Sequence, residues 1–98
     1  MIYELEFHEK ALKEWKKLGE NVRPQLKSKL ERRLAEPRVP KSALHGMPDC
    51  YKIKHESFRL IYQVIEGTRV IRVLAVGTRE RLAAYQASED RLDEAPSG

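Results

Sequence analysis

The chain has few of the residues that build disulfide frameworks and metal centres. Cys50 is its only cysteine in 98 residues, so an internal disulfide is excluded. Its histidines and carboxylates also lack the paired spacing typical of metal ligands, and the sequence predicts neither a structural zinc site nor a cofactor. A protein of this composition is expected in a reducing compartment.

Long apolar runs are absent as well. No run approaches the ~20 residues that a membrane-spanning helix requires. Glu4 and Glu6 stand where an export signal would have a basic start followed by an apolar segment. We therefore expect a cytoplasmic protein with no membrane partner. Residues 1–98 are expected to form one domain, with a frayed tail at about residues 93–98.

Acidic residues are scarce in two stretches of the chain. Residues 10–41 hold eleven Lys and Arg against four Glu, a balance of +7, and residues 52–81 hold seven against three, a balance of +4. This asymmetry favours an anionic partner, and nucleic acid is the commonest one for a basic domain. The alternative for the first stretch is a solvated helix face.

The spacing of apolar residues predicts the element order β-α-α-β-β-β-α. Residues 2–7 alternate like a half-buried strand, and residues 8–18 repeat apolar side chains at helical spacing. A second helix follows Asn21, a candidate N-cap, and ends before the two prolines at positions 37 and 40. Strands are expected at about residues 51–55, 58–66 and 69–77, and a final helix at about residues 79–92.

The predicted fold class is α+β. Two N-terminal helices should pack on one face of a largely antiparallel four-stranded sheet, together with a C-terminal helix. Val22, Leu26, Leu30 and Leu34 make the apolar stripe of the second helix, and Trp15 belongs to the stripe of the first. The opposite face of the sheet is expected to stay available for a ligand.

Three cations should gather on that opposite face. A two-residue turn at 56–57 makes Lys54 face Arg59 and Lys52 face Ile61. Like charges on opposing strand positions destabilise a sheet, so the arrangement indicates a polyanion such as an RNA phosphate. The alternative is a solubilising, edge-protecting face.

The third and fourth strands have a predicted register too. A two-residue turn at 67–68 places Val76 beside Arg59 and Leu74 beside Ile61. Arg79 then emerges just past the strand end nearest Arg59. This pairing depends on strict alternation, because a slip of one residue would reverse the face assignment.

Such a cluster has the chemistry for cleaving RNA without a metal. The reaction needs a base for the ribose 2′-hydroxyl, stabilisation of the charge that develops on the phosphate, and an acid for the 5′-oxygen. Crowding among cations pushes a lysine towards its neutral form, so Lys52 or Lys54 is the candidate base. Arg59 and Arg79 would hold the phosphate.

Other residues have weaker assignments. His8 and His55 are badly placed for this chemistry, and His45 is either an ordinary loop histidine or a phosphate contact. Tyr85 would stack on a base or pack at the helix–sheet boundary. Arg81 would bind a flanking phosphate or only solvent.

The sequence resembles the RelE family of bacterial toxins. The resemblance covers nearly the whole chain: the opening strand, residues 11–19, 46–54, 59–65 and 76–81, and Tyr85. It implies a microbial-ribonuclease-like fold and metal-free cleavage of messenger RNA in the ribosomal A site through 2′-hydroxyl attack. The implied partners are the 70S ribosome with its messenger RNA and a RelB-like antitoxin.

The resemblance also implies individual roles. Lys52 and Lys54 match basic residues implicated in base function and phosphate stabilisation, and Arg59 matches a transition-state arginine. Arg79 matches a general acid or phosphate ligand, and Tyr85 matches a tyrosine that stacks on the substrate base. Arg81 matches a further basic position of the family.

Two departures from the family pattern stand out. His45 replaces an arginine of close relatives, and the turn at residues 56–57 is shorter than in the best-known members. Two alternative functions remain: a ParE-like toxin acting on DNA gyrase, which would lack this basic set, and a non-catalytic RNA-binding module.

Overall fold

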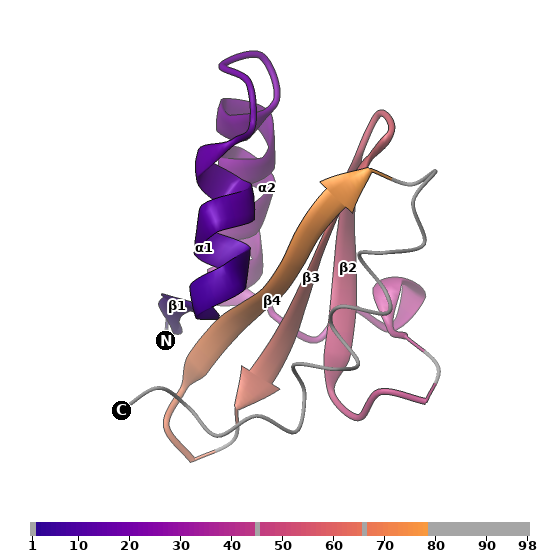
Figure 1. The fold of residues 1–98 in the computed structure, drawn as a ribbon. Coiled ribbons are helices and arrows are strands. Elements are labelled where there is room, and N and C mark those ends of the chain that lie inside the picture. Colours follow the sequence, from indigo (N-terminus) through magenta and orange to yellow (C-terminus); the bar gives the residue numbers. More distant parts are fainter. Residues whose placement is uncertain (1, 45, 66, 79–98) are drawn as a thin grey trace.

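The computed structural model describes residues 2–44, 46–65 and 67–78. In chain order it contains β1 (Glu4–Phe7), α1 (Glu9–Lys16), α2 (Arg23–Ala35), a short 3-10 helix η1 (Pro40–Ser42), β2 (Cys50–His55), β3 (Phe58–Ile65) and β4 (Val70–Thr78) (Figure 1). The described residues therefore form an α+β fold, with two α-helices and a four-stranded sheet. The C-terminal helix and the tail expected from the sequence lie outside the described residues.

The sheet is mixed, with strand order β1-β4-β3-β2. The pairs β2–β3 and β3–β4 are antiparallel, whereas β1 runs parallel to β4 from Glu4↔Val70 to Phe7↔Val73. Parallel pairing requires a long crossover, and here both helices and the β2–β3 hairpin intervene between the paired strands. β2 is an edge strand of the sheet (Figure 1). α2 packs against it.

The predicted register of the first hairpin is confirmed. Lys54 pairs with Arg59 and Lys52 with Ile61. This agreement follows from the turn, because two connecting residues leave one register for the flanking strands.

The predicted register of the second hairpin is wrong at its far end. Arg59 faces Gly77 instead of Val76, and Ile61 faces Ala75 instead of Leu74. A β-bulge between Ile61 and Tyr62 adds one residue to β4. Leu74 and Ala75, although consecutive, both join the cluster that contains Ile61, so the bulge buries two neighbouring apolar residues on one face.

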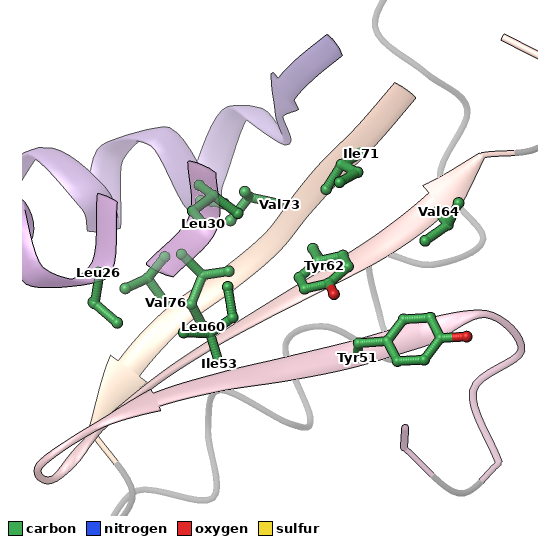
Figure 2. Packing of buried hydrophobic residues seen from close by; sticks show 11 residues of the cluster. Leu26, Leu30, Tyr51, Ile53, Leu60, Tyr62, Val64, Ile71, Val73 and Val76 are labelled. Carbon is green, nitrogen blue, oxygen red and sulfur yellow. The ribbon is translucent and has the colours of Figure 1, made fainter. Parts of the chain in front are cut away.

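The main core lies between the helices and one face of the sheet. Leu26 and Leu30 of α2 are fully buried, and Figure 2 shows them facing the strands near Val73 and Val76. Each such leucine contributes about 1.5–3 kcal/mol of hydrophobic stabilisation. Val22, Leu34 and Trp15 pack at the margin of this core, as their helical spacing predicted.

The helix starts differ in their capping. His8 is the N-cap of α1, where its Nδ1 accepts a hydrogen bond from the Lys10 backbone N–H at 3.1 Å. The predicted N-cap of α2, Asn21, is wrong. Val22 takes that position without a side-chain hydrogen bond, and Pro24 follows in the first turn, where a missing N–H costs little.

A second, smaller core covers the middle of the opposite face. It consists of Met47, Cys50, Ile61, Leu74 and Ala75, with Leu44 packed against it. The loop before β2 is thus attached to the sheet through Leu44 and Met47. The expectation of a fully available face needs correction, because the centre of that face is buried.

Candidate functional site

Lys52, Lys54 and Arg59 leave the sheet on the face opposite the helices. Their neighbours Ile53 and Leu60 belong to the main core, so the alternation of the strands directs the three cations the other way. Lys54 is exposed, Lys52 is half-buried and Arg59 is only 8% exposed. The structure therefore brings together three of the residues predicted for the site.

Arg59 is fixed at the tip of the β2–β3 hairpin. Its Nη1 donates to the backbone carbonyls of Glu56 at 2.9 Å and Phe58 at 2.8 Å. Glu56 has a φ of 53°, a left-handed conformation that aims its carbonyl within reach of the guanidinium. The buried charge of Arg59 is thus held by backbone dipoles directly opposite Lys54.

A basic groove adjoins this hairpin. It has a volume of about 540 Å³ and lies between α2, η1 and β2. Its lining residues are Lys29, Arg32, Arg33, Lys41, Ser42, Lys52, Ile53 and Lys54, of which six are cationic and none is acidic. Concave surfaces lined by one sign of charge concentrate counter-ions, so the groove favours anions over neutral molecules.

The cations of α2 were not assigned to the site from the sequence. The sequence offered only a basic helix whose orientation was open. A signal for it existed in the spacing of these cations: Arg32 and Arg33 lie three and four residues after Lys29, so both share a side of the helix with it. That side borders β2 in the structure.

A hydrogen-bond network joins Arg33, which lines the groove, to the buried Tyr62. The Tyr62 hydroxyl accepts a hydrogen bond from Arg33 Nη1 at 3.0 Å and donates to the Pro37 carbonyl. Burial raises the pKa of Tyr62, although Arg33 works against that shift, so the phenol stays protonated at neutral pH. Tyr62 can therefore serve as a donor that ties β3 to the end of α2.

Asp49, which precedes β2, has a structural role, because its carboxylate is bound by Arg38 and Tyr51. Its carboxylate forms two hydrogen bonds with Arg38, at 3.0 and 2.8 Å, and accepts another from the Tyr51 hydroxyl at 3.2 Å. Burial and this carboxylate together raise the pKa of Tyr51. Asp49 also has a φ of 56°, so it marks the turn that leads into β2.

Cys50 belongs to the second core at the start of β2 and is not a nucleophile. Its side chain is buried, and burial, followed by the charge of Asp49, raises its pKa to about 12. The reactive thiolate is thus almost absent at neutral pH.

Neither described histidine reaches the lysine face. His8 is occupied as a helix cap. His55 pairs with Phe58, which packs against the main core, so its side chain leaves the sheet on the helix side. Its Nε2 lies 4.0 Å from Glu56 Oε1. The prediction that His55 faces away from Lys52 and Lys54 is confirmed.

Four predicted site residues lie outside the described part of the chain: His45, Arg79, Arg81 and Tyr85. Arg79 is the next residue in sequence after Thr78, the end of β4. Thr78 pairs with Phe58, one position from Arg59. The roles of these four residues stay predictions.

Comparison with known proteins relates the chain to bacterial toxins. Residues 5–83 match the family described as ParE toxin of type II toxin–antitoxin system, parDE. Over 94 residues the chain is 52% identical to the mRNA interferase toxin RelE of Escherichia coli, covering 94% of this chain and 99% of that protein. A putative RelE-like toxin protein from Escherichia coli is 44% identical over the same shares of the two chains.

Solved structures agree. An Escherichia coli RelE variant with two arginines replaced by alanine, in the free state, has a TM-score of 0.86 and 50% identity, with 93% of this chain and 98% of that chain covered. The toxin in the intact Escherichia coli RelBE toxin–antitoxin complex has a TM-score of 0.77 and 56% identity, with 81% and 99% covered. The chain therefore belongs to the RelE/ParE family of toxins from type II toxin–antitoxin systems.

Proposed function

We propose that this protein is an mRNA interferase, the toxin of a toxin–antitoxin pair that cleaves messenger RNA in the ribosomal A site. The observation that carries the proposal is 52% identity, over nearly the whole chain, to a protein named mRNA interferase toxin RelE. The opposed Lys54 and Arg59, with Lys52 on the same face, supply the cationic pocket that such chemistry needs.

The proposed reaction is an internal transfer of the phosphate. Lys52 or Lys54 takes the proton of the 2′-hydroxyl, and the 2′-oxygen forms a bond to the adjacent phosphorus. The bond from phosphorus to the 5′-oxygen breaks, and that oxygen receives a proton, for which Arg79 is the candidate donor. The products are a 2′,3′-cyclic phosphate and a free 5′-hydroxyl, so no water is consumed in this step.

The remaining residues hold and orient the RNA. Arg59 stabilises the extra negative charge of the transition state, Tyr85 stacks on the substrate base, and Arg81 and His45 contact the RNA. The solved Escherichia coli variant supports a role for a pair of arginines, because the two arginines replaced there are two positions apart. Arg79 and Arg81 of this chain have the same spacing.

A ParE-like action on DNA gyrase is the second candidate, since the matching family is described by the name ParE. The full-length relatives favour the interferase, because those at 44–52% identity carry RelE names. A non-catalytic RNA-binding module is the third reading of the same cationic face.

A ribosome assay, together with a gyrase supercoiling assay, separates the three candidate functions. Purified protein is added to ribosomes programmed with a defined messenger RNA, and new RNA ends are mapped by primer extension. Ends that require the ribosome, and that disappear in folded Lys54→Ala and Arg79→Ala variants, support the interferase. RNA binding without new ends supports the module, and loss of gyrase supercoiling activity supports the ParE-like toxin.

The proposed partner in the cell is a RelB-like antitoxin. The Escherichia coli relative has been solved in complex with its antitoxin RelB and with a RelBc peptide. We expect the antitoxin to block access to the ribosome and the protein to act in the cytoplasm. Among the described residues, no helix is long and apolar enough to cross a membrane. Co-expression with a candidate RelB-like antitoxin, followed by size-exclusion chromatography, tests the pairing.

A further inference from the structure

The edge strand β2 is fastened to α2 at two points. Lys29 Nζ donates a hydrogen bond to the backbone carbonyl of Lys54 at 2.8 Å. Arg33 Nη1 donates to the backbone carbonyl of Lys52 at 3.3 Å. The two cations of α2 therefore bind the main chain of the two lysines proposed to carry the chemistry.

The spacing of these contacts follows from backbone geometry. Lys29 and Arg33 are four residues apart, which is a rise of about 6.0 Å along a helix. Lys52 and Lys54 are two residues apart, which is about 6.6 Å along a strand. One side of α2 thus matches every second carbonyl of an antiparallel edge strand, and both contacts form without bending either element.

Arg33 is itself held in place. Its Nη1 donates to Tyr62 Oη at 3.0 Å, its Nη2 donates to Ser42 Oγ at 3.3 Å, and its guanidinium lies 5.9 Å from the Tyr62 ring centroid. These contacts join α2, η1, β2 and β3 through one half-buried side chain. A planar guanidinium with several fixed donors suits such a junction better than a flexible ammonium.

The choice of cations is informative. A carbonyl at a sheet edge is satisfied by water or by a neutral donor. Lys29 and Arg33 instead add positive charge beside Lys52 and Lys54, which a design for stability alone would avoid. Arg32 lines the same groove, yet it makes no hydrogen bond to β2 among the described residues. The bonds to the β2 carbonyls therefore distinguish Lys29 and Arg33 from Arg32, which has the same charge.

We propose that Lys29 and Arg33 are positioning residues that hold β2 in place against α2, so that Lys54 stays opposite Arg59 and Lys52 stays on the same face of the sheet. An edge strand that is paired on one side opens more easily than a central strand, and a small displacement at a reacting group lowers the rate steeply. This inference rests on the proposed interferase function.

The test compares three variants on programmed ribosomes. Lys29→Met removes the charge and the bond to the Lys54 carbonyl, Lys29→Arg keeps both, and Arg32→Met removes an equal charge with no bond to β2. Single-turnover cleavage is measured over a range of toxin concentrations, which separates the rate at saturation from the concentration for half-saturation. Circular dichroism and urea unfolding verify that each variant is folded.

The expected result is a loss of about 10- to 100-fold in the saturated rate for Lys29→Met, with recovery in Lys29→Arg. Arg32→Met removes an equal charge but no bond to β2. Its saturated rate should therefore stay well above that of Lys29→Met. Hydrogen exchange of the β2 amides should speed up in Lys29→Met and not in Arg32→Met.

Equal saturated rates in Lys29→Met and Arg32→Met would overturn the positioning role, because only charge would then matter. That outcome leaves the interferase function intact, since the wild-type protein would still cut. Absence of new RNA ends with the wild-type protein would instead overturn the interferase function and this inference with it.

Discussion

The Glu14 carboxylate accepts a hydrogen bond from the backbone N–H of Val76, with 3.1 Å between Oε1 and N. β1 ends at Phe7, whose partner is Val73, and the His8 N–H donates to the Val73 carbonyl. Beyond that point the described residues supply no further strand on this side of β4. Where β1 ends, a side chain of α1 therefore provides the hydrogen-bond acceptor for β4. This contact lies near Thr78, the end of β4, which Arg79 follows in the sequence.

Replacing Glu14 should destabilise the protein, in part through its contact with Val76. Glu14→Ala leaves the Val76 N–H without its carboxylate partner, and we expect a loss of about 1–3 kcal/mol in the free energy of unfolding. Glu14→Gln keeps an acceptor at the same reach and should lose less. Urea unfolding measures both, with exposed Glu9→Ala on the same helix as the control. A Glu14→Ala variant that is as stable as the wild type would show that the contact to Val76 contributes no stability.

The lysines of the hairpin should affect stability and cleavage in opposite directions. Lys54 opposes Arg59, so Lys54→Ala relieves repulsion and should leave the free energy of unfolding unchanged or raise it by about 0.2–1 kcal/mol. The Lys29 contact survives because it uses the main chain of Lys54. Messenger RNA cleavage should fall at least tenfold. Urea unfolding and primer extension on ribosomes measure the two effects.

Arg59→Ala provides the contrasting case. Arg59 is buried and its Nη1 bonds two carbonyls, so its removal should destabilise the hairpin as well as reduce cleavage. A Lys54→Ala variant that is destabilised as strongly as Arg59→Ala would contradict the assignment of Lys54 to a functional instead of a structural role.

The sequence was most informative where local geometry decides. The turn at Glu56 and Ser57 determines the pairing of Lys54 with Arg59, and alternation places Lys52 on the same face. The bulge at Leu74 and Ala75 was missed, because it depends on which apolar residues the second core can bury, and that is a property of packing.

Contacts between distant segments were also beyond the sequence. The parallel pairing of β1 with β4 joins residues more than sixty positions apart, and no local pattern specifies it. Lys29 and Arg33 bind backbone carbonyls of β2. Every residue has a backbone carbonyl, so the residue types at positions 52 and 54 do not predict these contacts. Side-chain-to-main-chain contacts of this kind need the fold before they can be seen.

The hairpin tip should gain stability from glycine at position 56. Glu56 has a φ of 53°, a region that costs a residue with a side chain about 1–2 kcal/mol. Glycine avoids this strain but loses about 0.5–1 kcal/mol in backbone entropy, so Glu56→Gly should stabilise by roughly 0.5–1 kcal/mol. Ser57→Gly is the control, since Ser57 is not among the described residues with positive φ and should only be destabilised. Thermal unfolding separates the two variants, and a stabilised Ser57→Gly would assign the gain to flexibility alone.

The buried thiol of Cys50 should make the protein less stable at high pH. Its pKa rises from an ordinary 9.0 to about 12 on folding, because the thiolate is poorly solvated and lies near Asp49. Between those values the unfolded chain loses the proton and the folded chain keeps it. The stabilisation is complete below pH 9 and falls as pH rises towards 12, by at most about 1.4 kcal/mol per pH unit.

Cys50→Ala isolates this contribution. The variant loses packing and should be less stable than the wild type at pH 7, but the difference between the two should shrink as pH rises above 9, because only the wild type carries a thiol. Urea unfolding at pH 7, 9 and 10 measures that difference. The contribution of Tyr62 cancels between the two proteins, and that of Tyr51 nearly does, because Cys50 is the smallest cause of its raised pKa. A difference that stays constant over this range would show that the thiol ionises equally well in the folded and unfolded chains, and would contradict its burial in the second core.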